Sequence, residues 1–226
     1  MKNKYLIISL MLMLVVGCRI GGVRGNGNVV EEARDVTGFS HVDVSGVFSV
    51  KIEAGKDNKV VVRAESNLMK YIVTTVKGDK LIISTRKNIN PKKDLKIYIA
   101  TNDIKSINAS GATDIKIYNI DTEKFYADLS GASDLKLEGK VNKLMIDASG
   151  ASEIHAKNLI ANSVKIDASG ASDVSVHANQ SLIVDASGAS NIDYYGTPTK
   201  VSHDISGAGS LNKKGNWKLV LLMNDE

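Results

Sequence analysis

The sequence predicts an all-β fold, and within that class a two-sided parallel β-helix, or solenoid, with rungs of about 19 residues. Three observations carry this prediction. Ser-Gly-Ala occurs six times, and successive copies are 20, 19, 20, 18 and 19 residues apart. Apolar and polar residues alternate on both sides of each copy, as they do in strands. The same Asp, Ser and Ala recur in nearly every copy, as expected where matching positions stack on neighbouring rungs.

The glycine of each copy predicts a corner between two strands. Glycine adopts a positive φ without a Cβ clash, and the small Ala that follows lets the chain turn tightly. A meander of hairpins could use the same unit, but it would place matching positions only on every second strand. The coil is therefore favoured, and the crossover rule predicts that it is right-handed. The glycines are Gly111, Gly131, Gly150, Gly170, Gly188 and Gly207.

Residues 29–226 are predicted to form one domain with two parts. The strands of 29–100 are less regular, and we expect them to begin the sheet and to cover its exposed end. Within them, Ser45-Gly46-Val47 is related to the repeat, and Lys77-Gly78-Asp79-Lys80 predicts a hairpin turn. Residues 101–215 carry the Ser-Gly-Ala rungs, and "NWKLVLLMNDE" predicts a final strand.

The N-terminus has the pattern of a lipoprotein signal. Two lysines and an apolar run are followed by Val15-Val16-Gly17-Cys18, which resembles the bacterial lipobox, where the signal is cut before a Cys that then receives lipid. We expect a signal peptide over 1–17, lipidation at Cys18, and a lipid anchor with a Gly-rich tether over 18–28. An ordinary cleaved signal is the alternative. The expected location is the bacterial cell envelope, at the outer membrane.

The charge balance argues against one class of partner, and the cysteine content excludes internal disulfides. Without the signal, 27 basic residues face 25 acidic ones, a net charge of +2, because 2 of the 29 Lys and Arg lie in the signal. This balance argues against a nucleic acid partner. Cys18 is the only cysteine, so the chain forms no internal disulfide.

Two positions of the repeat are acidic and predict two ladders of carboxylates if the rungs stack in register. Like charges about 4.8 Å apart repel by about 1 kcal/mol per pair in water. Solvent and turn hydrogen bonds could relieve this repulsion, or Ca²⁺ could, through six to eight oxygen ligands. No other cofactor is predicted. The candidate residues are Asp128, Asp147, Asp167, Asp185 and Asp204 in one ladder, and Asp134, Glu153 and Asp173 in the other.

Catalytic patterns are absent from the sequence. No Gly-x-Ser-x-Gly elbow occurs, and the repeated serines recur too often to be one activated nucleophile. His41, His155 and His177 fall at different phases of the repeat, so we expect surface residues and no metal cluster. A polysaccharide-active β-helix enzyme is the alternative, with Tyr118, Tyr194 and Tyr195 as residues that could stack on sugars.

The stretch "GNGNVVEEARDVTGFSHVDVSGVFSVKIEAG" and the repeated "SGAS" turns resemble the head GIN domain family of auto-transporter adhesins, whose function is unknown. The resemblance covers about residues 27–215. It implies an all-β, β-helix-like fold on a lipoprotein of the bacterial envelope, and it brings no catalytic residues.

Together these observations predict a lipid-anchored envelope protein that is not an enzyme and acts by binding or adhesion. The expected ligand is a glycan or a protein, and copies could associate through their sheet edges. A polysaccharide-active enzyme and a purely structural envelope component are the alternatives.

Overall fold

The computed structural model describes residues 21–215. These residues form strands and one 3-10 turn, Met69–Tyr71, so the predicted all-β class is confirmed. The first strands are β1 (Val23–Arg24), β2 (Val29–Arg34), β3 (His41–Ala54), β4 (Lys59–Glu65), β5 (Ile72–Lys77), β6 (Lys80–Thr85), β7 (Ile89–Asn90) and β8 (Lys96–Thr101). The later strands are β9 (Ser106–Leu129), β10 (Asp134–Ala148), β11 (Glu153–Ala168), β12 (Asp173–Ala186), β13 (Asn191–Tyr195), β14 (Lys200–Ile205) and β15 (Ser210–Lys213).

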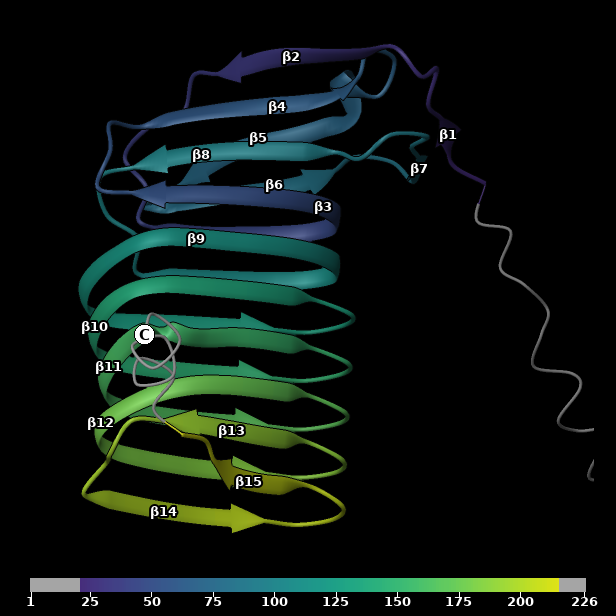
Figure 1. Cartoon of the computed structure of the whole chain (residues 1–226). Helices are drawn as coiled ribbons and strands as arrows, with labels where there is room; N and C mark the ends of the chain where they lie inside the picture. The colour runs from purple at the N-terminus through teal and green to yellow at the C-terminus, as the bar shows by residue number, and fades with distance from the viewer. Residues whose placement is uncertain (1–20, 216–226) are drawn as a thin grey trace, which may run out of the picture.

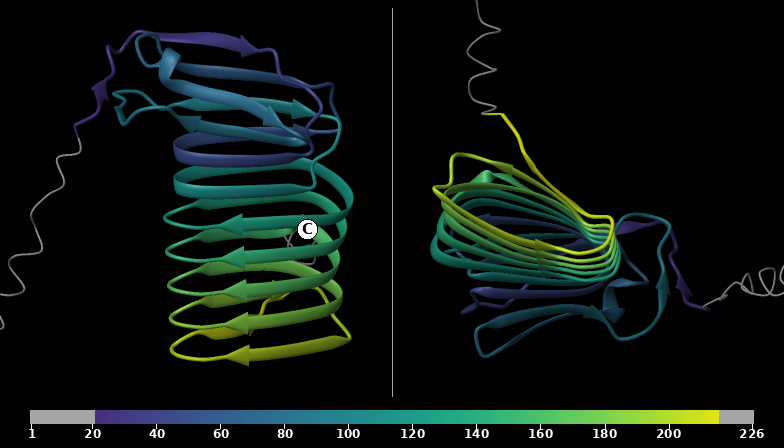
Figure 2. Two further views of the ribbon diagram at one scale, coloured as in Figure 1. Left: turned by 180° about the vertical axis from the view of Figure 1, so that it is seen from behind. Right: turned by 90° about the horizontal axis from the view of Figure 1, so that it is seen from below.

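Strands β9 to β12 lie one above another and pair in parallel (Figure 1). Matching positions are direct neighbours, since Ile146 pairs with Ile166 and Asp147 with Asp167. Figure 2 shows, from below, that successive copies lie over one another. Along β10, Leu144 and Ile146 are buried inside the stack, whereas Asp147 is partly exposed. The period-two pattern thus separates the apolar interior from the polar outer faces.

The Ser-Gly-Ala-Ser motif builds the corners between strands. Gly150 has a φ of +77°, and a Cβ there would lie 2.5 Å from the carbonyl oxygen of Gly131 on the preceding rung. Ala151 N–H donates a 2.8 Å hydrogen bond to that same oxygen. Ser152 is buried, and its Oγ donates to the carbonyl oxygen of Ser149 at 2.9 Å. The same Ser-to-Ser bond recurs at three further corners, made by Ser133, Ser172 and Ser190. The repeated Ser-Gly-Ala-Ser motif therefore has a structural role: it forms the corners between strands.

The N-terminal part covers one end of the stack with antiparallel strands. β5 and β6 form a hairpin whose last pair is Lys77 and Lys80, which confirms the predicted turn. β4 pairs antiparallel with both β2 and β8. β3 pairs in parallel with β9, and Gly46 lies beside Gly111. In the main sheet, parallel pairing thus starts at β3, inside the range expected to be irregular.

Of the prediction of a parallel β-helix for the whole domain, the all-β class is confirmed, but not a closed coil of parallel strands. The main sheet has 13 strands and is mixed, and its order runs open from β15 to β2 rather than closing. Three pairs are antiparallel: β2 with β4, β4 with β8, and β5 with β6. Parallel and antiparallel strands share a side-chain period of two, so alternation in the sequence does not distinguish them.

The stretch expected to be a tether is held against this end of the molecule from residue 22 onward. Val23 N–H and Gly25 N–H donate to the carbonyl oxygens of Asn88 and Asn90 at 2.9 and 3.0 Å. Any Cβ on Gly25 would overlap the carboxylate of Glu65. Glycine is therefore needed here for close packing, a role that composition alone does not separate from flexibility.

Candidate functional site

The first acidic row consists of Asp128, Asp147, Asp167, Asp185 and Asp204, which the structure stacks in register on β9, β10, β11, β12 and β14. The expected ladder is therefore formed. A shallow groove of about 340 Å³ runs along it. Serines of the corners complete the lining, so the groove combines hydroxyl groups with carboxylates. Its residues are Asp128, Asp147, Ala148, Ser149, Asp167, Ala168, Ser169, Asp185 and Ser187.

Neighbouring side chains neutralise part of this row. Tyr126 donates its hydroxyl to Asp147, and this bond, with lost hydration and nearby carboxylates, raises the pKa of the tyrosine. Lys165 lies 2.7 Å from Asp167, and that contact raises the pKa of the lysine. Burial raises the pKa of Asp128, with smaller contributions from the charges of Asp147 and Asp43. The row is therefore an acidic surface with only partial compensation.

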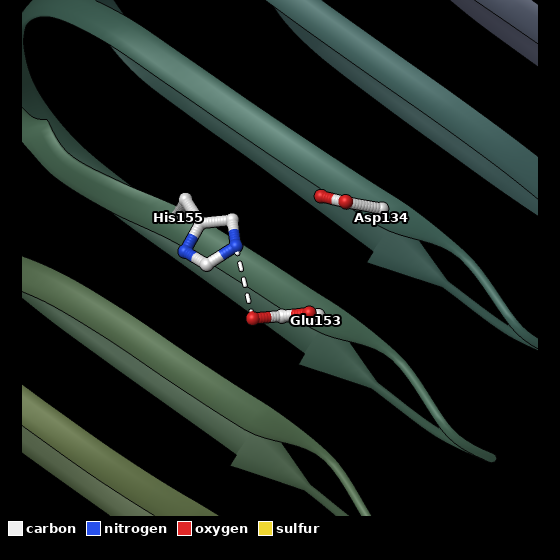
Figure 3. Close-up of side chains that lie close together, drawn as sticks. All are labelled: Asp134, Glu153 and His155. Atoms are coloured by element: carbon white, nitrogen blue, oxygen red, sulfur yellow. Dashed lines mark ion pairs between the residues drawn. The ribbon is translucent and has the colours of Figure 1, made fainter.

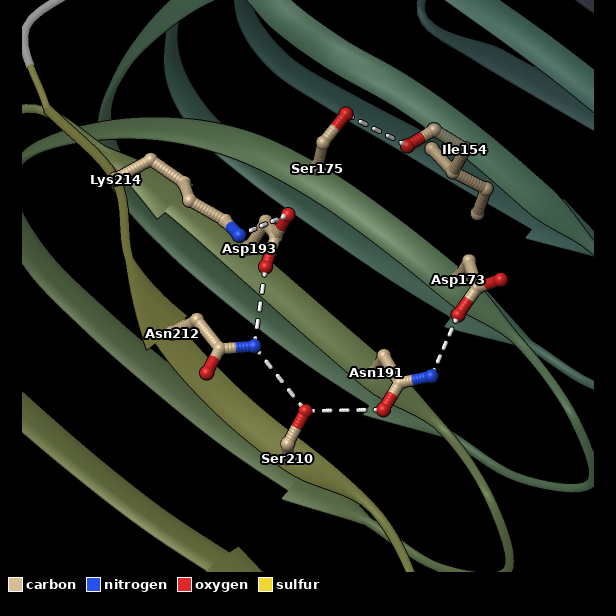
Figure 4. Close-up of polar contacts among 8 residues, drawn as sticks. All are labelled: Ile154, Asp173, Ser175, Asn191, Asp193, Ser210, Asn212 and Lys214. Carbon is tan, nitrogen blue, oxygen red and sulfur yellow. Dashed lines mark hydrogen bonds and ion pairs between the residues drawn. The ribbon is translucent and has the colours of Figure 1, made fainter.

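The second acidic row contains Asp114, Asp134, Glu153 and Asp173, and it continues through Asn191 and Ser210 in the same register. Toward its end the carboxylates give way to amides and hydroxyls (Figure 4). Asn191 Nδ2 donates to Asp173 at 3.0 Å, and Ser210 Oγ donates to Asn191 Oδ1 at 2.9 Å. This part of the row is satisfied by its own hydrogen bonds.

The Ser-Gly-Ala corner separates the two rows, since one precedes it and the other follows it along every rung. The eight acidic candidates therefore form two rows on separate faces rather than one site. Cys18, the expected lipidation site, lies outside the described residues.

His155 belongs to this site, although the sequence-based expectation placed no metal cluster at the histidines. Its Nε2 lies 3.0 Å from Glu153 Oε1 (Figure 3). One ligand atom from each of Asp134, Glu153 and His155 lies within 4.8 Å of the others. The expectation compared histidines with one another and did not weigh carboxylates as neighbours of a single histidine. Glu153-Ile154-His155, two residues apart on a strand, was the available signal.

A second hollow, also about 340 Å³, lies beside β3, β4 and β8. It includes Tyr98, which is 38% exposed and which sequence reasoning did not single out. The tyrosines that it did single out form no common platform. Tyr118 lies on β9 with the ammonium groups of Lys51 and Lys136 5.5 and 5.8 Å from its ring centre, while the other two lie on β13. They are Tyr194 and Tyr195.

Within residues 21–215, no helix has the length and apolarity needed to cross a membrane.

Comparisons with known proteins agree with this architecture. A family model described as "Putative auto-transporter adhesin, head GIN domain" matches residues 38–198. Among curated proteins, none matches the sequence. The fold is similar to that of a "putative adhesin" from Bacteroides fragilis, with a TM-score of 0.72 and 23% identity, over 85% of this chain and 100% of the other.

Two structures from Parabacteroides distasonis are also similar. One is a "putative lipid binding protein", with a TM-score of 0.57 and 20% identity over 86% of this chain and 100% of the other. The second is a "putative adhesin", with a TM-score of 0.56 and 18% identity over the same shares. At these identities the likeness concerns the fold.

Proposed function

Because the chain belongs to the head GIN domain family, we propose that it is a lipid-anchored protein of the bacterial cell envelope that acts by binding, as an adhesin does, and not by catalysis. The ligand class that we propose is a glycan or a protein with hydroxyl, amide or cationic groups. The observation that carries the proposal is the first acidic row: five aspartates lie in register, and four of them line a shallow groove together with serine side chains.

A repeated row suits adhesion better than it suits catalysis. A catalytic carboxylate needs an environment different from that of its neighbours, so that its pKa and position suit one step. Here equivalent carboxylates repeat at successive rungs, which favours many similar contacts with an extended ligand. The proposed right-handed, two-sided β-helix over the parallel rungs would hold these contacts at a fixed spacing.

The binding proposal is tested with the chain purified in detergent. Pull-downs from envelope and polysaccharide extracts, followed by titration of the recovered partner, should give saturable binding. The variant Asp147→Asn/Asp167→Asn should weaken it at least about tenfold, since charge-assisted hydrogen bonds to two carboxylates are lost. Asp121→Asn/Glu123→Gln, which changes carboxylates on a different surface of the stack, is the matched control and should bind normally.

Two outcomes would contradict the proposal. Repeated failure to recover a saturable partner would favour a purely structural envelope component. Release of soluble oligosaccharides from the polysaccharide extract by the intact chain would favour the polysaccharide-active enzyme.

Anchoring is proposed to occur through Cys18, after removal of residues 1–17, with residue 18 onward at the outer membrane. Cys18→Ala should move the chain from the membrane fraction to the soluble fraction, because no acyl chain can be attached without the thiol. Cys18→Ser is the closest size match and should behave in the same way. Unchanged fractionation of both variants would contradict lipidation.

We also propose Ca²⁺ as a ligand of the acidic rows. The free energy of unfolding should rise as Ca²⁺ reaches millimolar concentrations, by about 2.7 kcal/mol at 100 times the Kd. Melting curves with and without the ion measure this effect. A melting temperature that does not change would leave the rows without a bound ion.

A further inference from the structure

Asp134, Glu153 and His155 converge on the outer face of β10 and β11 (Figure 3). We propose that these three side chains form a binding site for one divalent transition-metal cation, with Zn²⁺ as the probe. The site goes beyond the proposed adhesive function, because a chain that binds no glycan could still bind the cation.

The backbone fixes the three residues relative to one another. Asp134 pairs with Glu153 and Lys136 with His155 in the ladder between β10 and β11. Glu153 and His155 are two residues apart on one strand, so their side chains leave the same face. The site therefore requires no loop rearrangement to form.

The distances suit a small coordination sphere. Zn–N and Zn–O bonds of about 2.0 to 2.2 Å with tetrahedral angles place neighbouring ligand atoms about 3.4 Å apart. His155 Nε2 and Glu153 Oε1 are 3.0 Å apart, and the ligand atom of Asp134 lies within 4.8 Å of both. Because all three side chains are exposed, a small rotamer change closes the remaining gap. Water would supply the fourth ligand, as in open zinc sites.

The imidazole of His155 favours a transition-metal cation over Ca²⁺ at this site. Ca²⁺ prefers six to eight oxygen ligands, whereas Zn²⁺ and related cations bind imidazole nitrogen together with carboxylate oxygen. Among the described residues, this is the one group of three or more candidate ligands, and it contains a histidine. His155 therefore separates this site from the Ca²⁺ proposal for the rows.

Neighbouring rungs show how such carboxylates are otherwise neutralised. Asp114 pairs with Lys116 at 3.2 Å, whereas Lys136, the equivalent lysine next to Asp134, pairs with Glu138 at 2.7 Å instead. Within residues 21–215, the Asp134 carboxylate forms no ion pair or hydrogen bond. Asp114 and Glu153 lie beside it on the two neighbouring rungs. A bound cation would stabilise this charge.

The test is a Zn²⁺ titration of the chelator-treated chain against a chromophoric zinc indicator. One equivalent should bind per chain, and His155→Ala and Asp134→Asn should each weaken binding about tenfold or more. His203→Ala on β14 and Asp121→Asn on β9 change an exposed histidine and an exposed aspartate that belong to neither acidic row. They are matched controls and should leave the affinity unchanged. Equal affinities in all variants, or no binding to the wild-type chain, would overturn the proposal.

X-ray absorption of the Zn²⁺-loaded wild-type chain provides a measurement that no folding defect affects. One imidazole nitrogen at about 2.0 Å is expected. A sphere of oxygen ligands alone would overturn the assignment to His155. Ca²⁺ binding that is insensitive to His155→Ala is expected, because an imidazole is a poor Ca²⁺ ligand.

Discussion

At the scale of single residues, the corner glycines meet two separate physical requirements. Gly150 and Gly55 have almost the same positive φ, +77° and +74°. A Cβ on Gly150 would collide with the preceding rung at 2.5 Å, whereas a Cβ on Gly55 would meet nothing within 4 Å. Alanine substitutions at these two glycines therefore separate the energetic cost of the backbone conformation from the cost of a clash between neighbouring rungs.

Gly55→Ala should lower the free energy of unfolding by about 1 to 2 kcal/mol, the cost of a left-handed conformation for a residue with a Cβ. Gly150→Ala should cost about 3 kcal/mol, because overpacking against the carbonyl of Gly131 adds to that strain. Chemical denaturation of both variants measures the difference. Equal losses would show that the rungs adjust freely to a methyl group.

Glu65 is a second residue whose environment decides its role. Its side chain is buried, and its carboxylate accepts hydrogen bonds from the N–H groups of Gly27, Lys92 and Lys93. Lost hydration alone would raise the pKa of Glu65, but these three hydrogen bonds, together with the charge of Lys92, outweigh it and leave the pKa below its usual value of 4.5. The charged carboxylate thus joins the N-terminal segment to the loop before β8.

Glu65→Gln should lower the melting temperature at pH 7, because the amide replaces one acceptor oxygen with a donor facing backbone N–H groups. A depressed folded-state pKa contributes stability above the unfolded value, and this is lost as pH falls through the folded value. The difference in melting temperature between wild type and variant should therefore be largest at pH 7 and should decrease below about pH 4.5. Melting curves across pH test this, with exposed Glu31→Gln as the control. A gap that is constant from pH 7 to pH 3 would contradict it.

At the scale of elements, the first acidic row imposes an electrostatic cost on the strands that carry it. Asp128 carries part of this cost, since burial and, to a smaller extent, the charges of Asp147 and Asp43 raise its pKa. A carboxyl whose pKa is higher in the folded state than in the unfolded state destabilises the fold once it is ionised.

Asp128→Asn should raise the melting temperature at pH 7, because it removes a partly buried charge and its repulsion by Asp147 and Asp43. It also retains a carbonyl acceptor for Asn108, whose Nδ2 lies 3.4 Å from Asp128 Oδ2. This difference in melting temperature should disappear near pH 3, where the wild-type carboxyl is protonated and therefore uncharged, like the amide of the variant. Asp185→Asn, in the same row but more exposed, should change stability less. A lower melting temperature for Asp128→Asn would show that the charge is stabilising.

At the scale of the whole molecule, the rungs are equivalent units, since β10 pairs with β11 and β11 with β12 in the same register of Asp, Ala and apolar residues. Stability in such stacks is approximately a sum of unit and neighbour terms. If one rung is removed, the two rungs that then meet should therefore form the same types of contact as before.

Deletion of residues 151–170, one full rung between Gly150 and Ala171, should leave a folded β protein with a lower melting temperature, because one interface between rungs is lost. Deletion of residues 151–160 removes half a rung, misplaces the next corner, and should abolish cooperative unfolding. Circular dichroism with thermal melting distinguishes the two. Unfolding of the full-rung variant would show that the rungs are not interchangeable.

The sequence by itself determined the all-β class, the corners and the two acidic rows. Each depends on a local requirement that repeats: alternation fixes the faces, Gly150 and its equivalents fix the turns, and the fixed interval places Asp147 beside Asp167. Local rules of this kind are visible in a single sequence because side-chain period and positive φ are properties of short segments.

Only the tertiary structure decided which contacts cross between distant segments. The antiparallel strands over one end of the stack, the bonds of Glu65 to residues 38 and 27 positions away, and the approach of Asp134 to His155 depend on how rungs and hairpins meet in space. Alternation has the same period in parallel and antiparallel strands, and the spacing of Glu153 and His155 shows only that these two side chains share a face. The physical reason is that pairing direction and side-chain convergence are set by packing between segments, which no local sequence rule encodes.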